Sequence, residues 1–148
     1  MANLISHSRA RFDYEIMESF EAGIELLGNE VKSIRNHQGK IEGTHIIVRG
    51  GEAYIIGMHI PPYQPNNTAE NYDADRNRKL ILTKKEIIEL EGADAKKGLT
   101  IVPLALYPKG SKIKVNIAIV RGKKNFDKRA SIKKRDTDRE ISREYKVR

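Results

Sequence analysis

The sequence predicts one mainly β domain of antiparallel strands with two or three helices, followed by a basic C-terminal tail. Short β-rich runs recur between residues 12 and 119, and several alternate apolar with polar side chains, as strands with one buried face do. Two segments, near residues 29–35 and 83–97, instead have helical spacing and helix end signals. Residues 121–148 carry too few large apolar side chains to form a core.

About six strands can remove their exposed edges by closing into a small antiparallel barrel, which is the architecture that we predict. An open α+β sandwich is the alternative. The chain of 148 residues fits one domain, which we assign to residues 1–120, with the tail at residues 121–148.

The first strand is predicted from the alternation of apolar and acidic residues in 12–16. The alternation slips at Met17-Glu18 and resumes through residues 20–26, which indicates a bulge or a bend. Gly28 then interrupts the strand.

A short helix is predicted next, with Asn29 as its N-cap. Val31 and Ile34 lie three residues apart and so share one face of it. Gly39 and Gly43 follow soon, which keeps the helix short.

Residues 46–48 and 54–56 are β-rich and flank Gly50-Gly51, which predicts a hairpin. Three prolines then end regular structure, and the polar stretch up to Asp75 is predicted to be a long loop.

A second helix is predicted after the β-rich residues 80–82. Thr83 and Glu86 have the spacing of a capping box, and Lys96-Lys97 followed by Gly98 is typical of a helix C-terminus. The helix should therefore run from Thr83 towards Gly98.

Two more strands complete the predicted domain. The first covers 99–107 and contains Pro103, so part of it should be an edge or a bulge. After a turn at 108–110, residues 113–119 alternate most regularly in the whole chain.

The formal net charge of +8 indicates a polyanionic partner. It is uneven, because residues 1–120 carry a net charge of +1 and residues 121–148 carry +7. The chain has no cysteine and no apolar run long enough to span a membrane, and its N-terminus does not resemble a signal peptide. We expect a cytoplasmic protein with no membrane contact.

Catalytic motifs are absent from the sequence. The four histidines form no His-Glu-x-x-His run, and neither a phosphate-binding loop nor a Gly-x-Ser-x-Gly turn occurs. Asp73 and Asp75 lie beside Arg76 and Arg78, and we interpret them as solvated ion pairs. We therefore predict no enzymatic activity, no metal site and no cofactor.

Several groups of residues could bind RNA, because phosphate contacts need flexible cations and an exposed aromatic ring can stack on a base. These candidates are Arg9, Arg11, Lys32, Arg35, Tyr63, Arg76, Arg78 and Lys79.

Motifs in order along residues 9–145 resemble the small protein B family, the bacterial SsrA-binding proteins that bind transfer-messenger RNA. The matching segments are 11–16, 20–24, 28–35, His59-Ile60-Pro61-Pro62-Tyr63, Arg78-Lys79-Leu80-Ile81-Leu82, Val102-Pro103-Leu104, Arg121-Gly122-Lys123-Lys124 and Asp127-Lys128-Arg129. His7, Phe12 and Thr83 depart from the family pattern.

The resemblance implies an OB-fold-like barrel and a role in ribosome rescue by trans-translation. The body would bind the tRNA-like part of transfer-messenger RNA, with Glu30, Lys32, Ser33, Arg35, Tyr63, Arg78 and Lys79 on or near the contact face. Glu30 could accept hydrogen bonds from bases, or it could stabilise the N-terminus of its helix. Elongation factor Tu and alanyl-tRNA synthetase could be further partners through the RNA.

The resemblance also implies that the tail is disordered in solution and becomes helical in the decoding site and empty mRNA channel of a stalled 70S ribosome. The implied tail residues are Gly122, Lys123, Lys124, Asp127, Lys128, Arg129, Lys133, Lys134, Arg135, Ile141 and Tyr145. Gly122 would be a joint between body and tail. The alternatives are a generic OB-type RNA chaperone or ribosome-associated protein, and an enzyme acting on RNA.

Overall fold

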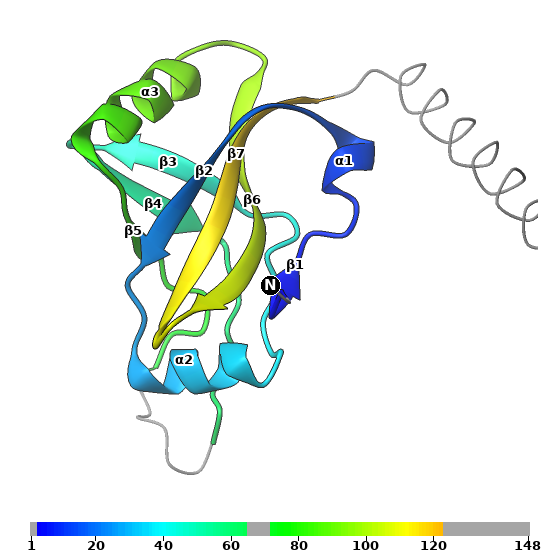
Figure 1. Cartoon of the computed structure of the whole chain (residues 1–148), viewed down its shortest axis with the longest axis vertical. Coiled ribbons are helices and arrows are strands. Elements are labelled where there is room, and N and C mark those ends of the chain that lie inside the picture. Colours follow the sequence, from blue (N-terminus) through cyan, green and yellow to red (C-terminus); the bar gives the residue numbers. More distant parts are fainter. Residues whose placement is uncertain (1–2, 65–71, 123–148) are drawn as a thin grey trace, which may run out of the picture.

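The computed structural model describes residues 3–64 and 72–122, which form one seven-stranded antiparallel sheet with three helices (Figure 1). Along the chain, the elements are β1 (Ile5–Ser6), α1 (Ala10–Asp13), β2 (Tyr14–Ile24), α2 (Gly28–Arg35), β3 (His45–Arg49), β4 (Glu52–Ile56), β5 (Arg78–Ile81), α3 (Lys84–Asp94), β6 (Leu99–Lys109) and β7 (Lys112–Gly122). Within these residues no helix has the length and apolar character needed to cross a membrane.

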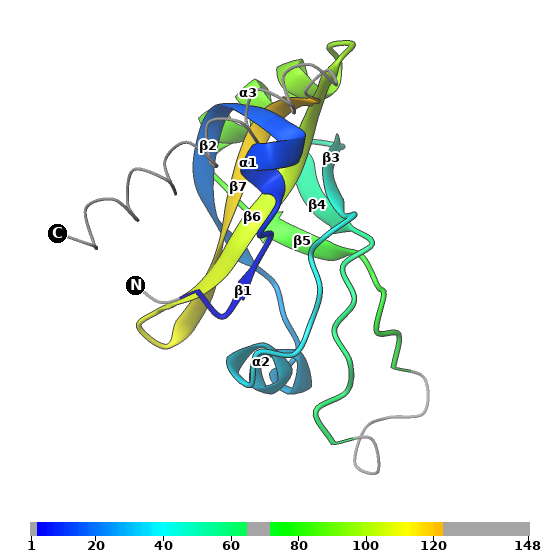
Figure 2. The same cartoon turned by 90° about the vertical axis from the view of Figure 1, so that its right-hand side faces the viewer.

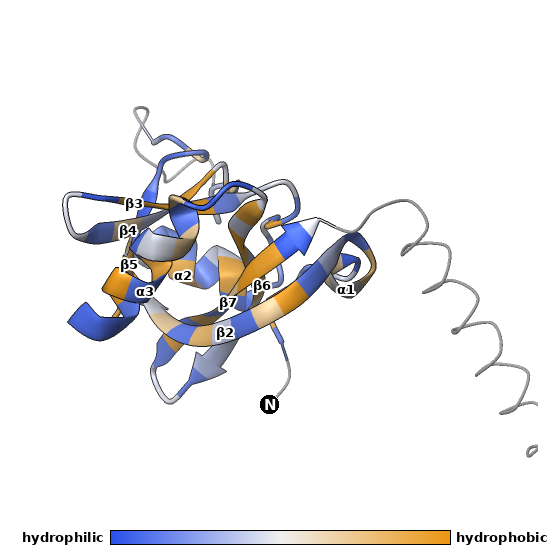
Figure 3. Cartoon of the chain, turned by 90° about the horizontal axis from the view of Figure 1, so that it is seen from above, coloured by the Kyte–Doolittle hydropathy of each residue, from blue (hydrophilic) through white to orange (hydrophobic). Residues whose placement is uncertain are grey.

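The strand order is β1-β6-β7-β2-β5-β4-β3. β2 pairs with β7 along nearly its whole length, but it pairs with β5 only through Gly23 and Ile24. The sheet therefore turns at the end of β2, and β3 comes back close to β6. Figure 3 shows the alternation of hydrophilic and hydrophobic residues along β2.

The predicted closed barrel is wrong, because no hydrogen-bonded pairing joins β3 to β6 or to β1 among the described residues. The free edge of β6 has other neighbours. β1 pairs with it through Ile5 and Leu106, and α3 packs against both β6 and β3 across the remaining opening. Covering an edge with a helix protects it as closure would.

The main core lies inside the curved sheet and is built from β-branched and other apolar residues of every long strand. A smaller cluster of Val102, Ala118 and Val120 lies against Tyr14 and Ile16. Its neighbours at the N-terminus are the buried Ala10 and the His7 ring, which meets Tyr14 edge to face. α1 and the segment before it therefore cover the second face of the sheet.

Several predicted features are confirmed. β2 has a register shift between Ile16 and Glu18, and β6 has one after Pro103. β3 and β4 form a hairpin whose Gly50 and Gly51 have φ angles of 59° and 74°, which glycine adopts without strain. The Thr83–Glu86 capping box is present, with the Glu86 N–H donating to Thr83 Oγ1 over 3.2 Å.

The start of the first strand differs from the prediction, because residues 10–13 form α1 rather than a strand. The Arg9 guanidinium lies 4.8 Å from the centroid of the Phe12 ring. Residues three apart meet in this way only on a helical turn, so the cation–π contact favours the helix.

The predicted N-cap of α2 is also wrong. Leu27, not Asn29, occupies the N-cap position, and its side chain makes no capping hydrogen bond. Glu30 Oε1 instead accepts the Leu27 N–H over 2.8 Å, which satisfies one of the free donors at the helix start. α3 ends at Asp94, so Lys96 and Lys97 lie beyond its last turn.

Candidate RNA interface

The predicted RNA-binding residues of the body fall at two ends of the molecule (Figure 1). Arg9 and Arg11 lie before and within α1, near the end of β7. The others surround α2 at the opposite end, where α2, the start of β5 and the chain between β4 and β5 meet. Figure 2 shows that α2 and this connecting chain lie at the same end of the fold. We take the α2 end as the candidate interface.

A buried ionic cluster, formed by Glu30, Tyr72, Arg76 and Arg78, lies beneath the surface of this end. The side chains of Glu30 and Arg78 are fully buried. Glu30 Oε2 accepts hydrogen bonds from Arg78 Nε at 2.8 Å and from Arg78 Nη2 at 2.5 Å. Arg76 also donates to both carboxylate oxygens. Two guanidinium groups therefore neutralise one buried carboxylate.

The remaining bonds of the cluster hold the chain between β4 and β5. Arg78 Nη1 donates to the Met58 carbonyl at 2.5 Å, and Arg78 Nη2 donates to the Ala74 carbonyl at 3.0 Å. The Tyr72 hydroxyl donates to the Ile60 carbonyl at 2.8 Å and to Glu30 at 3.3 Å. The cluster thus joins α2 to both described ends of this connection.

The pKa of Glu30 reflects two opposing effects. Burial alone would raise this pKa, because it disfavours the charged form. Hydrogen bonds from Arg76, from the Leu27 N–H and from Arg78 outweigh burial and hold the pKa of Glu30 below its ordinary value. Glu30 is therefore ionised at neutral pH and attracts both arginines.

Ser33 belongs to the same supporting layer. It is fully buried, and its Oγ donates to the Pro61 carbonyl over 2.7 Å. Glu30, Ser33 and Arg78 thus offer no accessible surface to RNA in this structure. They fix the position of the residues that do.

The exposed residues of this end are mainly basic or aromatic. Lys32 and Arg35 are exposed on α2, and Arg35 Nη2 donates to the Ser111 carbonyl at 3.1 Å. Tyr63 is 40 % exposed. Lys79, on β5, forms an ion pair with Glu52 at 2.9 Å. A phosphate backbone could reach Lys32, Arg35 and the Tyr63 ring without any change in the fold.

One pair at this end was not found from the sequence. His59 Nδ1 lies 2.8 Å from Asp75 Oδ1, and an ionised carboxylate can only accept, so Nδ1 carries the proton. The interpretation of Asp73 and Asp75 as partners of the neighbouring arginines is wrong, since Asp73 accepts the Asp75 N–H. The His59 pair is sixteen residues apart in sequence, and only the folded connection brings it together.

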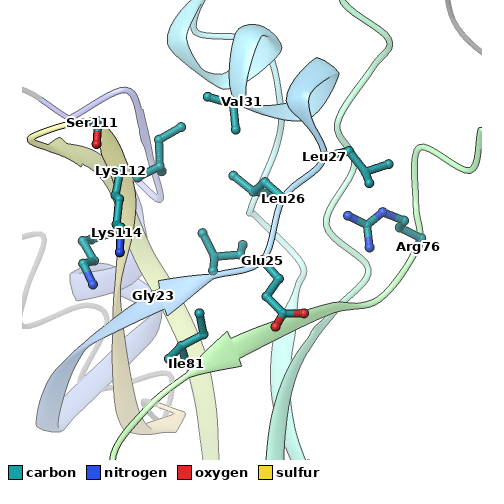
Figure 4. Close-up of a pocket in the computed structure, with 12 residues that line it drawn as sticks. Gly23, Glu25, Leu26, Leu27, Val31, Arg76, Ile81, Ser111, Lys112 and Lys114 are labelled. Carbon is teal, nitrogen blue, oxygen red and sulfur yellow. The ribbon is translucent and has the colours of Figure 1, made fainter.

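Two grooves flank α2. The first, which we call the hairpin groove, has a volume of about 670 Å³ and lies between the β6–β7 hairpin and the chain from β2 into α2 (Figure 4). Its lining includes Leu27, Ile81, Lys112 and Lys114. The second is lined by His37, Lys40, His59, Pro61, Pro62 and Tyr63, among others.

Of the predicted tail residues, the structure describes only Gly122, and residues 123–148 lie outside the described part. Gly122 pairs with Tyr14 in β7, so the last strand runs two residues past Val120. The tail therefore starts from the α1 end of the body, away from α2 (Figure 1).

Comparison with known proteins agrees with the motifs in the sequence. The family model described as "SmpB protein" matches residues 4–147. An SsrA-binding protein of Microcystis aeruginosa is 46 % identical over 143 residues, which cover 97 % of this chain and 93 % of the relative. One of Clostridium kluyveri is 48 % identical over 145 residues, covering 98 % and 92 % of the two chains.

A solved structure described as "tmRNA-SmpB: a journey to the center of the bacterial ribosome" is similar in fold as well. Its TM-score is 0.68 at 42 % sequence identity, and the match covers 81 % of this chain and 84 % of the other. With the family model matching nearly every residue, this chain belongs to the SmpB family of SsrA-binding proteins.

Proposed function

We propose that this protein is an RNA-binding adaptor of trans-translation, which binds transfer-messenger RNA and brings it to stalled ribosomes. The observation that carries the proposal is the SmpB family match over residues 4–147, together with the similarity to the ribosome-related tmRNA-SmpB structure. The protein contributes recognition and placement, and no chemical step is assigned to it. On this proposal it works in the cytoplasm, where ribosomes translate.

The α2 end of the body supplies the selective contact. Lys32 and Arg35 meet phosphates, while Tyr63 stacks on a base or a ribose. Because the body is nearly neutral, its selectivity comes from this local arrangement and not from net charge. Glu30, Ser33 and Arg78 act from below by fixing α2 against the connection that carries Tyr63.

The tail supplies the second contact, with the ribosome. Its net charge of +7, together with the resemblance to small protein B tails, supports a site along the decoding centre and the empty mRNA channel. The residues assigned to it are Lys123, Lys124, Asp127, Lys128, Arg129, Lys133, Lys134, Arg135, Ile141 and Tyr145. Elongation factor Tu and alanyl-tRNA synthetase would meet the protein only through the bound RNA.

The test measures the affinity of the full chain for transfer-messenger RNA and for an elongator tRNA at the same salt concentration, since salt alone changes such affinities strongly. We expect clearly tighter binding of transfer-messenger RNA. Equal affinity for both RNAs would favour a generic RNA chaperone instead.

A deletion separates the two contacts. Removing residues 123–148, which leaves β7 intact, should preserve most binding of transfer-messenger RNA by the body and abolish peptide tagging on stalled ribosomes. Tagging by the shortened protein would show that the tail has a different role.

A further inference from the structure

The hairpin groove has walls that suit a flat, apolar ligand. Leu27 is 49 % exposed and Ile81 is 57 % exposed, and both line the groove together with Val31 of α2. Figure 4 shows these side chains arranged around one depression. Exposed apolar side chains inside a groove offer contact to the face of an unstacked nucleobase.

Two cations border the same groove. Lys112 and Lys114 alternate along β7, so they project from the same face of the strand, and both line the groove. Neither forms an ion pair with any described residue. Their charge is therefore available to a phosphate group.

One carboxylate, Glu25, stands among the described lining residues. A carboxylate repels phosphates, but it accepts hydrogen bonds from base N–H groups. The Watson–Crick edge of guanine presents an imino and an amino donor side by side, which fits the two oxygens of a carboxylate. Adenine and uracil do not present two adjacent donors, so Glu25 favours guanine among these bases.

Gly23 keeps the groove open beside these groups. A β-carbon added at this position would lie 3.1 Å from Ile81 Cβ and 3.6 Å from Lys114 Nζ. From the walls, the lysines, Glu25 and this glycine together, we propose that the hairpin groove binds one unpaired guanosine of the RNA, with its base between Leu27 and Ile81 and its phosphates on Lys112 and Lys114. This site rests on the proposed RNA-binding function and adds a base preference to it.

The experiment uses the full chain with labelled methyl groups, titrated with the pentanucleotides UUGUU and UUAUU and followed by NMR. We expect UUGUU to shift the methyl signals of Leu27, Val31 and Ile81. It should bind about tenfold more tightly than UUAUU, within the range of about 1–3 kcal/mol for a good bidentate contact with a base. Absence of shifts at these methyl groups, or equal affinity for both RNAs, would overturn the proposal.

Variants test each part of the site. Glu25→Gln should bring the two affinities within about twofold, because an amide offers one acceptor where the carboxylate offers two. Lys112→Gln with Lys114→Gln should weaken both RNAs and lower the dependence of affinity on salt by about 0.7 per contact. Lys85→Gln, on the distant helix α3, is the matched control and should change neither quantity.

Gly23→Ala should weaken UUGUU, while Gly92→Ala, which adds the same atom to α3 in open space, should not. If Gly23→Ala disturbs β2, Leu27→Ser replaces it, since Leu27 is half exposed and lies outside the strands. Unchanged binding by Leu27→Ser would contradict the site.

Binding of transfer-messenger RNA distinguishes this site from the proposed function. If the Glu25 and Lys112/Lys114 variants keep full affinity for transfer-messenger RNA, the groove is not used, although the adaptor role stands. If the unaltered chain shows no preference for transfer-messenger RNA, the adaptor role itself fails.

Discussion

Three clusters in this protein combine a glutamate, a basic residue and a tyrosine, but only one of them is buried. Glu30 with Arg76, Arg78 and Tyr72 lies beneath α2. The exposed clusters are Glu52 with Lys79 and Tyr54, and Glu21 with Lys109 and Tyr107. The same kinds of residue therefore occur in two environments of one fold.

The pKa values show how the environments differ. The pKa of each of the three glutamates is lowered. For Glu21 the largest cause is the hydrogen bond from Lys109, and for Glu52 it is the hydrogen bond from Tyr54. For Glu30 the largest effect is burial, which opposes ionisation and is overcome only by several donors together. Burial thus makes the Glu30 cluster depend on every partner, whereas water can replace a partner in the exposed clusters.

The largest predicted effect comes from Glu30→Ala. It leaves the Arg78 guanidinium buried without its carboxylate, and breaking a buried pair in this way costs about 3–5 kcal/mol of unfolding free energy. Urea unfolding measures the loss. Adding Arg78→Met should recover part of it, and an additive double variant would show that the two side chains are not coupled.

Acid should affect the buried cluster next most strongly. The pKa of Glu30 is lowered in the folded protein, so its contribution to stability is present above its ordinary pKa of 4.5 and is lost as the pH falls from there through the lowered value. Unfolding midpoints between pH 7 and pH 3 should fall less steeply for Glu30→Gln. Equal slopes would contradict the assignment.

Tyr72→Phe should have a smaller effect, because it removes the hydroxyl that joins Ile60 to Glu30 but leaves both arginines in place. We expect a loss of about 1 kcal/mol in unfolding free energy. Tyr54→Phe removes the corresponding hydroxyl at Glu52 and is the control, with a smaller loss expected. A larger loss from Tyr54→Phe would reverse the comparison.

The smallest effects should come from the exposed carboxylates. Glu21→Gln and Glu52→Gln should leave the urea midpoint nearly unchanged, and any remaining change should disappear in high salt, which screens exposed charges. A large loss of stability that persists in high salt would show that exposed and buried clusters behave alike.

Local signals in the sequence predicted much of the fold. The bulge after Ile16, the Gly50-Gly51 hairpin and the Thr83 capping box each depend on residues close in sequence, and all three are present. Barrel closure failed as a prediction because it depends on distant partners. Here β1 and α3 occupy the neighbourhood of the β6 edge, and no local pattern announces that.

The candidate site was predictable by position but not by depth. The motifs placed Lys32, Ser33 and Arg78 near one surface, and they do meet at the α2 end. Charge in the sequence does not reveal that Arg78 is fully buried against Glu30, 48 residues away, or that His59 bonds to Asp75. Those facts follow from the path of the connection between β4 and β5.

The central claim is that buried residues of the α2 end hold the interface while their exposed neighbours contact RNA. Lys32 and Ser33 test it most directly, since they are adjacent in sequence but differ in exposure. The measurement is the salt dependence of transfer-messenger RNA affinity for Lys32→Ala and Ser33→Ala. We predict that Lys32→Ala weakens binding and lowers the salt slope by nearly one, whereas Ser33→Ala lowers stability by about 1 kcal/mol and keeps the affinity within twofold. Full affinity and an unchanged slope for Lys32→Ala, with weakened binding by a stably folded Ser33→Ala, would contradict the claim.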